Sequence, residues 1–85
     1  VLELVPAELA ARITAALSIP TIGIGAGIGC DAQVLVWTDM VGLTQDAPKL
    51  AKAYRDLRGE ILGAAREFAD DVRSGAFPSE DQTFH

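Results

Sequence analysis

The run from Ile19 to Gly27 constrains the fold more than any other stretch, because it is apolar at nearly every position and ends in alternating glycines. Thr21, Ile22 and Ile24 favour extended backbone, since β-branched side chains fit a pleated strand. A strand without a polar face is typical of a parallel sheet that helices cover on both sides. The glycines leave space for another backbone or a ligand. We therefore expect this run to form the middle strand of an alternating β/α chain.

The segments on either side continue the alternation. Residues 1–5 predict a strand with one carboxylate in its middle. Pro6 suits the first turn of a helix that ends near Ser18, with an apolar stripe of Leu9, Ile13, Ala16 and Leu17. After a glycine-containing loop at 27–31, residues 33–37 are nearly all apolar and predict another buried strand.

The second half of the chain predicts a long helix. Residues 40–43 indicate a short helical turn that closes at Gly42, and 44–48 are polar. From 48 to about 73 the apolar residues are spaced by three and four, as on one helix face, with Gly59 and Gly63 as points where the helix can bend. Ser74-Gly75 ends the helix, and a polar tail follows. The expected organisation is 1–47 (β-α-β-loop-β), 48–74 (helix) and 75–85 (tail), with Trp37 and Phe68 in the core.

Size and charge narrow the class of protein. Two successive β/α units fit an open doubly wound sheet or part of a (β/α)8 barrel. With 85 residues the chain has too few helices to cover a parallel sheet, so we expect a piece of a larger domain. A net charge of −5 argues against nucleic acid or anionic lipid as a partner. The single cysteine, Cys30, excludes an internal disulfide and fits a cytoplasmic protein, and no stretch is a convincing membrane span.

Glu3 is the best candidate for a catalytic group. It stands between Leu2 and Leu4, where burial would disfavour the anion, raise its pKa and suit it to accept a proton. It also lies near the carboxyl end of its strand, where β/α folds place catalytic residues. The alternatives are a solvated glutamate on an edge strand, or one paired with a buried arginine.

The other chemically suggestive residues have weaker support. Residues 27–32 match a G-x-G-x-x-A nucleotide fingerprint, but a strand-like segment follows where the fingerprint requires a helix. Asp31 and Asp39 could ligate a metal, although Asp in such positions more often bonds its local backbone. Cys30 has no partner thiol, and the only histidine is the terminal His85, so neither a zinc site nor a Cys/His nucleophile is indicated.

Taken together, these pieces resemble the C-terminal third of the ketopantoate hydroxymethyltransferase family. The resemblance runs in order through the whole chain and is carried by residues 1–10, 19–27, 31–36, 42–43, 48–49, 74–78 and 84–85. The sequence departs from the family pattern at Ala32, where the family usually has Gly, and at Gln82, where it usually has His.

The resemblance implies a (β/α)8 barrel of the phosphoenolpyruvate/isocitrate lyase type, of which this chain would carry the last three strands: Leu2 to Val5, Thr21 to Ala26 and Gln33 to Trp37. It implies transfer of a hydroxymethyl group from 5,10-methylenetetrahydrofolate to the keto acid 3-methyl-2-oxobutanoate. A Mg²⁺ ion, whose ligands lie upstream of this chain, would assist enolisation, and the family's base falls on Glu3. The resemblance further implies a cytoplasmic homo-oligomer. Two alternatives remain: a related Mg²⁺-dependent oxo-acid lyase or mutase, and a non-catalytic piece kept for assembly through the 50–72 helix.

Overall fold

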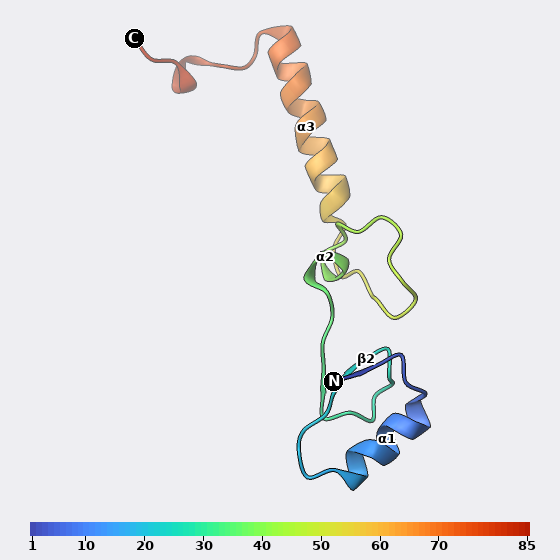
Figure 1. The fold of residues 1–85 in the computed structure, drawn as a ribbon. Helices are drawn as coiled ribbons and strands as arrows, with labels where there is room; N and C mark the ends of the chain where they lie inside the picture. Colours follow the sequence, from blue (N-terminus) through green and yellow to red (C-terminus); the bar gives the residue numbers. More distant parts are fainter.

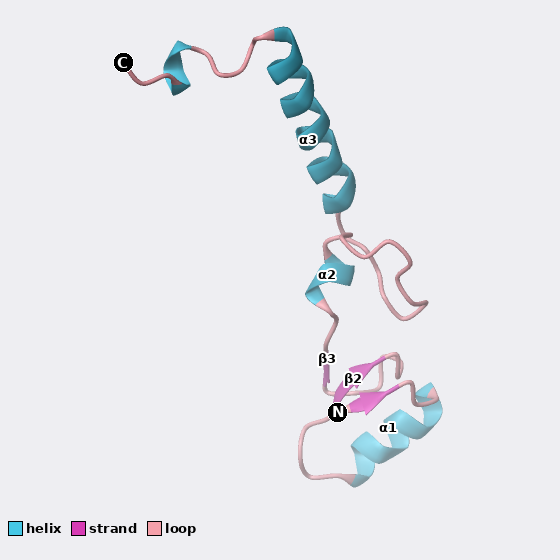
Figure 2. Ribbon diagram, turned by 45° about the horizontal axis from the view of Figure 1, so that its top comes forward, coloured by secondary structure: helices cyan, strands magenta, loops and turns pink.

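The computed structural model describes every residue from Val1 to His85. Three short strands and a first helix lie at one end, and a long helix leads away from them to the C-terminal tail (Figures 1 and 2). The elements in chain order are β1 (Leu2–Glu3), α1 (Ala7–Ala16), β2 (Ile22–Ile24), β3 (Ala32–Gln33), α2 (Trp37–Met40), α3 (Leu57–Ser74) and the 3-10 helix η1 (Glu80–Gln82).

The sheet is parallel and has the order β1-β2-β3, which confirms the expected β/α arrangement with the glycine-containing strand in the middle. Leu2 pairs with Gly23, and Gly23 pairs with Gln33 on the other side. The strands are shorter than expected, with two residues in β1, three in β2 and two in β3. Beyond β3 one more ladder bond, from the Val34 N–H to the Gly23 carbonyl at 3.0 Å, precedes the residues that lead into α2. The expected strand at 33–37 is therefore wrong at its carboxyl end, since Trp37 begins a helix.

Helix α1 begins after Pro6, as expected, but it packs through a different face. Its inward side carries small residues, with Ala10 fully buried and Thr14 Oγ1 2.8 Å from Thr21 Oγ1. A side chain at Gly27 or Gly29 would collide with Ala7 or Ala11. The predicted stripe is instead largely uncovered, with Leu9 and Leu17 each 46% exposed. Small side chains at this contact allow the loop after β2 to approach the helix closely.

The segment after α2 folds back on it. Helix α2 ends where Gly42 takes a positive φ of 78°, a conformation that glycine adopts without strain. The polar connection then runs out and returns, so that the Tyr54 N–H donates to the Met40 carbonyl at 2.8 Å. The N–H groups of Leu57 and Arg58 donate to Val41 and Gly42 at 3.0 and 3.2 Å. These bonds anchor the start of α3 to the end of α2.

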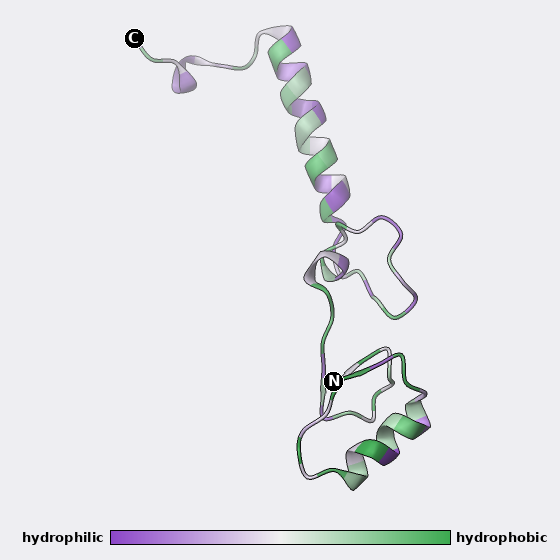
Figure 3. Ribbon diagram, in the orientation of Figure 1, coloured by the Kyte–Doolittle hydropathy of each residue, from purple (hydrophilic) through white to green (hydrophobic).

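Helix α3 begins at Leu57, so the prediction of a helix from residue 48 is wrong over its first nine positions. Asp56 provides the reason, because its side chain accepts a hydrogen bond from the Gly59 N–H at 3.1 Å and caps the helix there. The helix continues through Gly59 and Gly63 without a break and ends at Gly75, as expected. Apolar and polar residues alternate along its length (Figure 3).

The tail folds back only slightly. The rings of Phe68 and Phe77 meet edge to face with centroids 5.2 Å apart, and this contact fixes the exit from α3. Ser79 caps η1 by a reciprocal interaction with Gln82, whose side chain accepts from the Ser79 N–H at 2.9 Å.

The chain has little core of its own. Its radius of gyration is 21.7 Å and its extents are 69 × 26 × 13 Å, whereas a compact domain of this length has a radius near ~12 Å. Only five of 85 residues are buried, namely Ala10, Thr21, Gly23, Ala26 and Asp39. Trp37 is 62% exposed and Phe68 55% exposed, so the prediction that both are core residues is wrong within this chain. None of the helices is both long and apolar enough to cross a membrane.

Candidate functional site

The carboxyl ends of the three strands meet at one edge of the sheet, and this edge is the candidate site. Glu3 is the last residue of β1, Ile24 ends β2 and Gln33 ends β3. Glu3 and Ile24 are paired in register, and the Leu4 N–H extends the ladder to the Ile24 carbonyl at 3.0 Å. The expectation that Glu3 lies at the carboxyl end of its strand is confirmed.

The register also determines the face of the sheet on which Glu3 lies. Thr21 contacts Thr14 of α1 through the two hydroxyl groups, so Thr21 and, two residues later, Gly23 face α1. Ile22 and Ile24 therefore face the opposite side, and Glu3 shares that side because it pairs with Ile24. Helix α1 leaves this face open, and Glu3 is exposed. The residues of this chain do not supply the burial of Glu3 that its sequence setting suggested.

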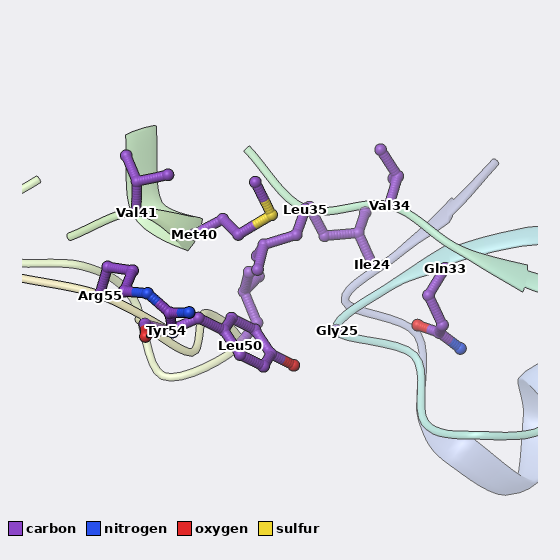
Figure 4. A pocket seen from close by; sticks show the side chains of 10 residues that line it. All are labelled: Ile24, Gly25, Gln33, Val34, Leu35, Met40, Val41, Leu50, Tyr54 and Arg55. Atoms are coloured by element: carbon purple, nitrogen blue, oxygen red, sulfur yellow. Dashed lines mark hydrogen bonds between the residues drawn. The ribbon is translucent and has the colours of Figure 1, made fainter. Parts of the chain in front are cut away.

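An open, mostly apolar pocket of about 820 Å³ extends from this edge toward α2 (Figure 4). We call it the carboxyl-edge pocket. Five of its residues come from the ends of β2 and β3: Ile24, Gly25, Gln33, Val34 and Leu35. The other five come from α2 and the returning segment: Met40, Val41, Leu50, Tyr54 and Arg55.

Gly25 lies close to both Leu4 after β1 and Leu50 of the returning segment. Its φ is +65°, and a Cβ there would lie 3.0 Å from Leu4 Cδ2 and 3.1 Å from Leu50 Cδ2. A strand-ending glycine thus lets Leu4 and Leu50 approach each other, and it also lines the pocket. This agrees with the expectation that the glycine-rich strand end provides close approach.

Asp31 links two parts of the sheet through hydrogen bonds to Thr21. Its Oδ2 accepts from the Thr21 N–H at 2.8 Å and lies 3.3 Å from the Thr21 hydroxyl, while the Asp31 N–H donates to that hydroxyl oxygen at 3.1 Å. These bonds tie the start of β2 to the start of β3, and with them the loop between the strands. Asp31 thus bonds backbone as expected, but the partner is Thr21, ten residues upstream, and not the local backbone of its own turn.

The remaining candidates lie apart. Asp39 is buried in α2, Cys30 is an unpaired thiol, and the His85 Nε2 lies 2.9 Å from Glu80 Oε2 in the tail. No group of three or more His, Cys, Asp and Glu side chains is placed to hold a metal ion. The fingerprint at 27–32 is followed by β3 and not by a helix, so the nucleotide interpretation stays rejected.

Sequence reasoning did not find the far wall of the pocket. Met40, Leu50, Tyr54 and Arg55 show no motif, and they come together only because the segment after α2 turns back. The one local signal was the glycine at position 42, which permits the reversal.

Comparison with known proteins gives one consistent result. The sequence profile described as Ketopantoate hydroxymethyltransferase matches residues 1–80. The chain is 64% identical to the 3-methyl-2-oxobutanoate hydroxymethyltransferase of Acidothermus cellulolyticus over 85 residues, which cover 99% of this chain and 31% of that protein. It is 60% identical to the protein of the same name from Streptomyces avermitilis, covering 100% of this chain and 30% of that protein. The corresponding protein of Mycobacterium ulcerans is 56% identical, with 99% and 29% covered. The chain thus spans about 30% of the length of the curated relatives it matches.

Proposed function

The chain belongs to the ketopantoate hydroxymethyltransferase family, and we propose that it supplies the C-terminal third of that family's (β/α)8 barrel. The support is architectural. Three parallel strands in sequential order, with a helix on one face only, are what consecutive units of such a barrel contribute. In a barrel the helices surround the sheet, so the face that α1 leaves open would line the interior.

Within the complete protein, we propose that this segment takes part in hydroxymethyl transfer from 5,10-methylenetetrahydrofolate to 3-methyl-2-oxobutanoate. One observation carries the proposal: Glu3 ends β1 on the open face, beside Ile24 of the carboxyl-edge pocket. Barrel enzymes place their catalytic residues at this end of the strands.

Glu3 is proposed as the general base. Its carboxylate would accept the proton from C3 of the keto acid, and the resulting enolate carbon would form a bond to the one-carbon unit. Water would supply the hydroxyl group, and tetrahydrofolate would leave as the bonds between its nitrogens and the one-carbon unit break. An acceptor-only carboxylate at the end of a short strand suits this role, because the paired backbone fixes its position. Burial in the closed barrel would then disfavour the charged form and strengthen the base.

The Mg²⁺ ion implied by the family does not fit the residues present here. No cluster of carboxylates or other metal-binding side chains exists in this chain, so no step is assigned to a metal held by it. A cytoplasmic location, which the unpaired Cys30 favours, belongs to the same proposal.

The exposed apolar surface defines the proposed partners. Val1 and Val36 at the sheet are 83% and 51% exposed, and the remaining strands of the barrel would cover them. Helix α3 extends away from the sheet with Ile61 and Val72 about half exposed (Figure 1). We propose that it contacts another subunit of a homo-oligomer.

The experiment requires a complete protein. In the A. cellulolyticus relative, the matching segment would be replaced by these 85 residues to give what we call the host protein. Exchange of the keto acid's C3 proton with deuterated water, followed by NMR without folate, isolates the proton transfer. Glu3→Gln should slow this exchange by roughly two to four orders of magnitude, while keto-acid binding persists.

Glu8→Gln is the matched control, because Glu8 is also an exposed glutamate but lies in the first turn of α1. It should leave the exchange rate unchanged. Exchange at the unsubstituted rate in the Glu3→Gln protein would show that another group removes the proton.

A further inference from the structure

We propose that the carboxyl-edge pocket binds the folate cosubstrate, with Tyr54 against its p-aminobenzoyl ring and Arg55 at its glutamate carboxylates. This inference rests on the proposed function and assigns to it a binding site for the second substrate. It concerns the wall of the pocket formed by the returning segment, not the strand end that carries Glu3.

The size and lining of the pocket favour the larger of the two substrates. Its volume of about 820 Å³ is in the range of sites that enclose drug-sized ligands, roughly 300–1,000 Å³. A keto acid with few heavy atoms would occupy a small part of that space. Seven of the ten lining residues are hydrophobic, which suits flat aromatic rings better than a small anion.

The charge at one end of the pocket matches an anionic tail. Arg55 is the only charged residue among those that line it, in a chain with 12 acidic and seven basic residues. The Lys52 ammonium lies 4.8 Å from the centroid of the Tyr54 ring and adds a second positive charge nearby. The neighbouring Asp56 carboxylate accepts from the Gly59 N–H and caps α3. A dicarboxylate is the complementary ligand.

The order of the groups also matches the cosubstrate. In Figure 4 the Tyr54 ring lies between Gly25 and the Arg55 side chain. Gly25 follows Ile24, the ladder partner of Glu3, so that end of the pocket is the one near the proposed base. A ligand with its one-carbon unit toward Glu3 would have its aryl ring at Tyr54 and its glutamate at Arg55.

The backbone holds these two side chains in place. The Tyr54 N–H donates to the Met40 carbonyl at 2.8 Å, and the Arg55 Nη1 donates to the Tyr54 carbonyl at 2.7 Å. The segment is therefore tied to α2 before any ligand binds, as a preformed site requires.

The test uses two cosubstrates in the host protein: 5,10-methylenetetrahydrofolate and its diamide, in which both glutamate carboxylates are neutral amides. Arg55→Met should raise KM for the folate about tenfold and leave KM for the diamide nearly unchanged, while Arg55→Lys should retain most of the preference. Arg58→Met, which removes an arginine that does not line the pocket, should change neither value. Tyr54→Ala should raise both KM values by the same factor, because the ring faces the part that the two ligands share.

The outcomes separate this inference from the proposed function. An equal rise in both KM values on Arg55→Met would show that Arg55 supports the fold and does not bind the carboxylates. No rise with either ligand, or no effect of Tyr54→Ala, would place the cosubstrate elsewhere. The folate-free exchange of the C3 proton should be normal in the Arg58→Met control. Its response to Glu3→Gln tests the proposed function independently of Arg55.

Discussion

Gly25→Ala should destabilise the host protein by about 2–3 kcal/mol, through two effects that the structure separates. A φ of +65° places the residue in the left-handed region, where a non-glycine residue costs about 1–2 kcal/mol. The added Cβ would lie 3.0 Å from Leu4 Cδ2 and 3.1 Å from Leu50 Cδ2, closer than the ~3.5–4.0 Å optimum for carbon atoms. Two of the three close atoms are ends of flexible leucine side chains, and the third is Leu50 Cβ at 3.2 Å. The crowding therefore lies near the lower limit for overpacking, about 1 kcal/mol.

The assay is urea unfolding of the host protein with and without the substitution. Leu4→Ala supplies the control, since it removes the nearest atom, Leu4 Cδ2 at 3.0 Å, and relieves part of the crowding but not the backbone strain. The double variant of Gly25→Ala and Leu4→Ala should therefore be more stable than the sum of the single effects predicts, by about 0.5 kcal/mol. Gly25→Val should be worse than Gly25→Ala, with impaired substrate binding, because its branches enter the carboxyl-edge pocket. A loss below about 0.5 kcal/mol on Gly25→Ala would refute the argument that only glycine fits here.

Three further expectations concern the fold. Asp31→Ala should destabilise the host protein by about 1–3 kcal/mol, because Thr21, 4% exposed, loses the acceptor for its N–H; an unchanged urea midpoint would contradict this. Asp56→Ala should cost about 1 kcal/mol and speed hydrogen exchange at the Gly59 amide, with Asp46→Ala in the preceding loop as the neutral comparison. The isolated 85-residue chain should have no transferase activity and no cooperative unfolding transition, since it buries only five residues; turnover or a sharp monomeric transition would contradict this.

The elements that local chemistry determines could be predicted, and those that depend on distant partners could not. Pro6 at the start of α1 and Gly75 at the end of α3 act through their own backbone preferences, and both ends were expected. The start of α3 was missed because apolar spacing continues upstream of Asp56, whereas the capping bond to Gly59 decides where the helix begins. The spacing of apolar residues indicates which face of a helix packs, whereas the capping residue determines where the helix begins.

Strand length is a non-local property, which explains the error at Trp37. Residues 34–36 have the side chains of a strand, but the ladder ends with the bond from the Val34 N–H to the Gly23 carbonyl, because no partner strand in this chain continues beside residues 35 and 36. Helix α2 then uses Trp37 for its first turn. The same reasoning applies to the core: Trp37 and Phe68 are apolar, yet their exposure depends on surfaces that only the rest of a barrel or another subunit could bring.

Glu3 shows how these two kinds of information combine at the site. Alternation along the strand separates it from Leu2, and the pairing with Ile24 assigns it to the face that α1 leaves open. The sequence argument for a base also requires removal of water, and here the carboxylate is exposed. Position is thus encoded in this segment, while desolvation must come from residues that close the barrel over it. It follows that Glu3 should act as a strong base only in the complete protein, so proton exchange should depend on barrel closure even when Glu3 itself is unchanged.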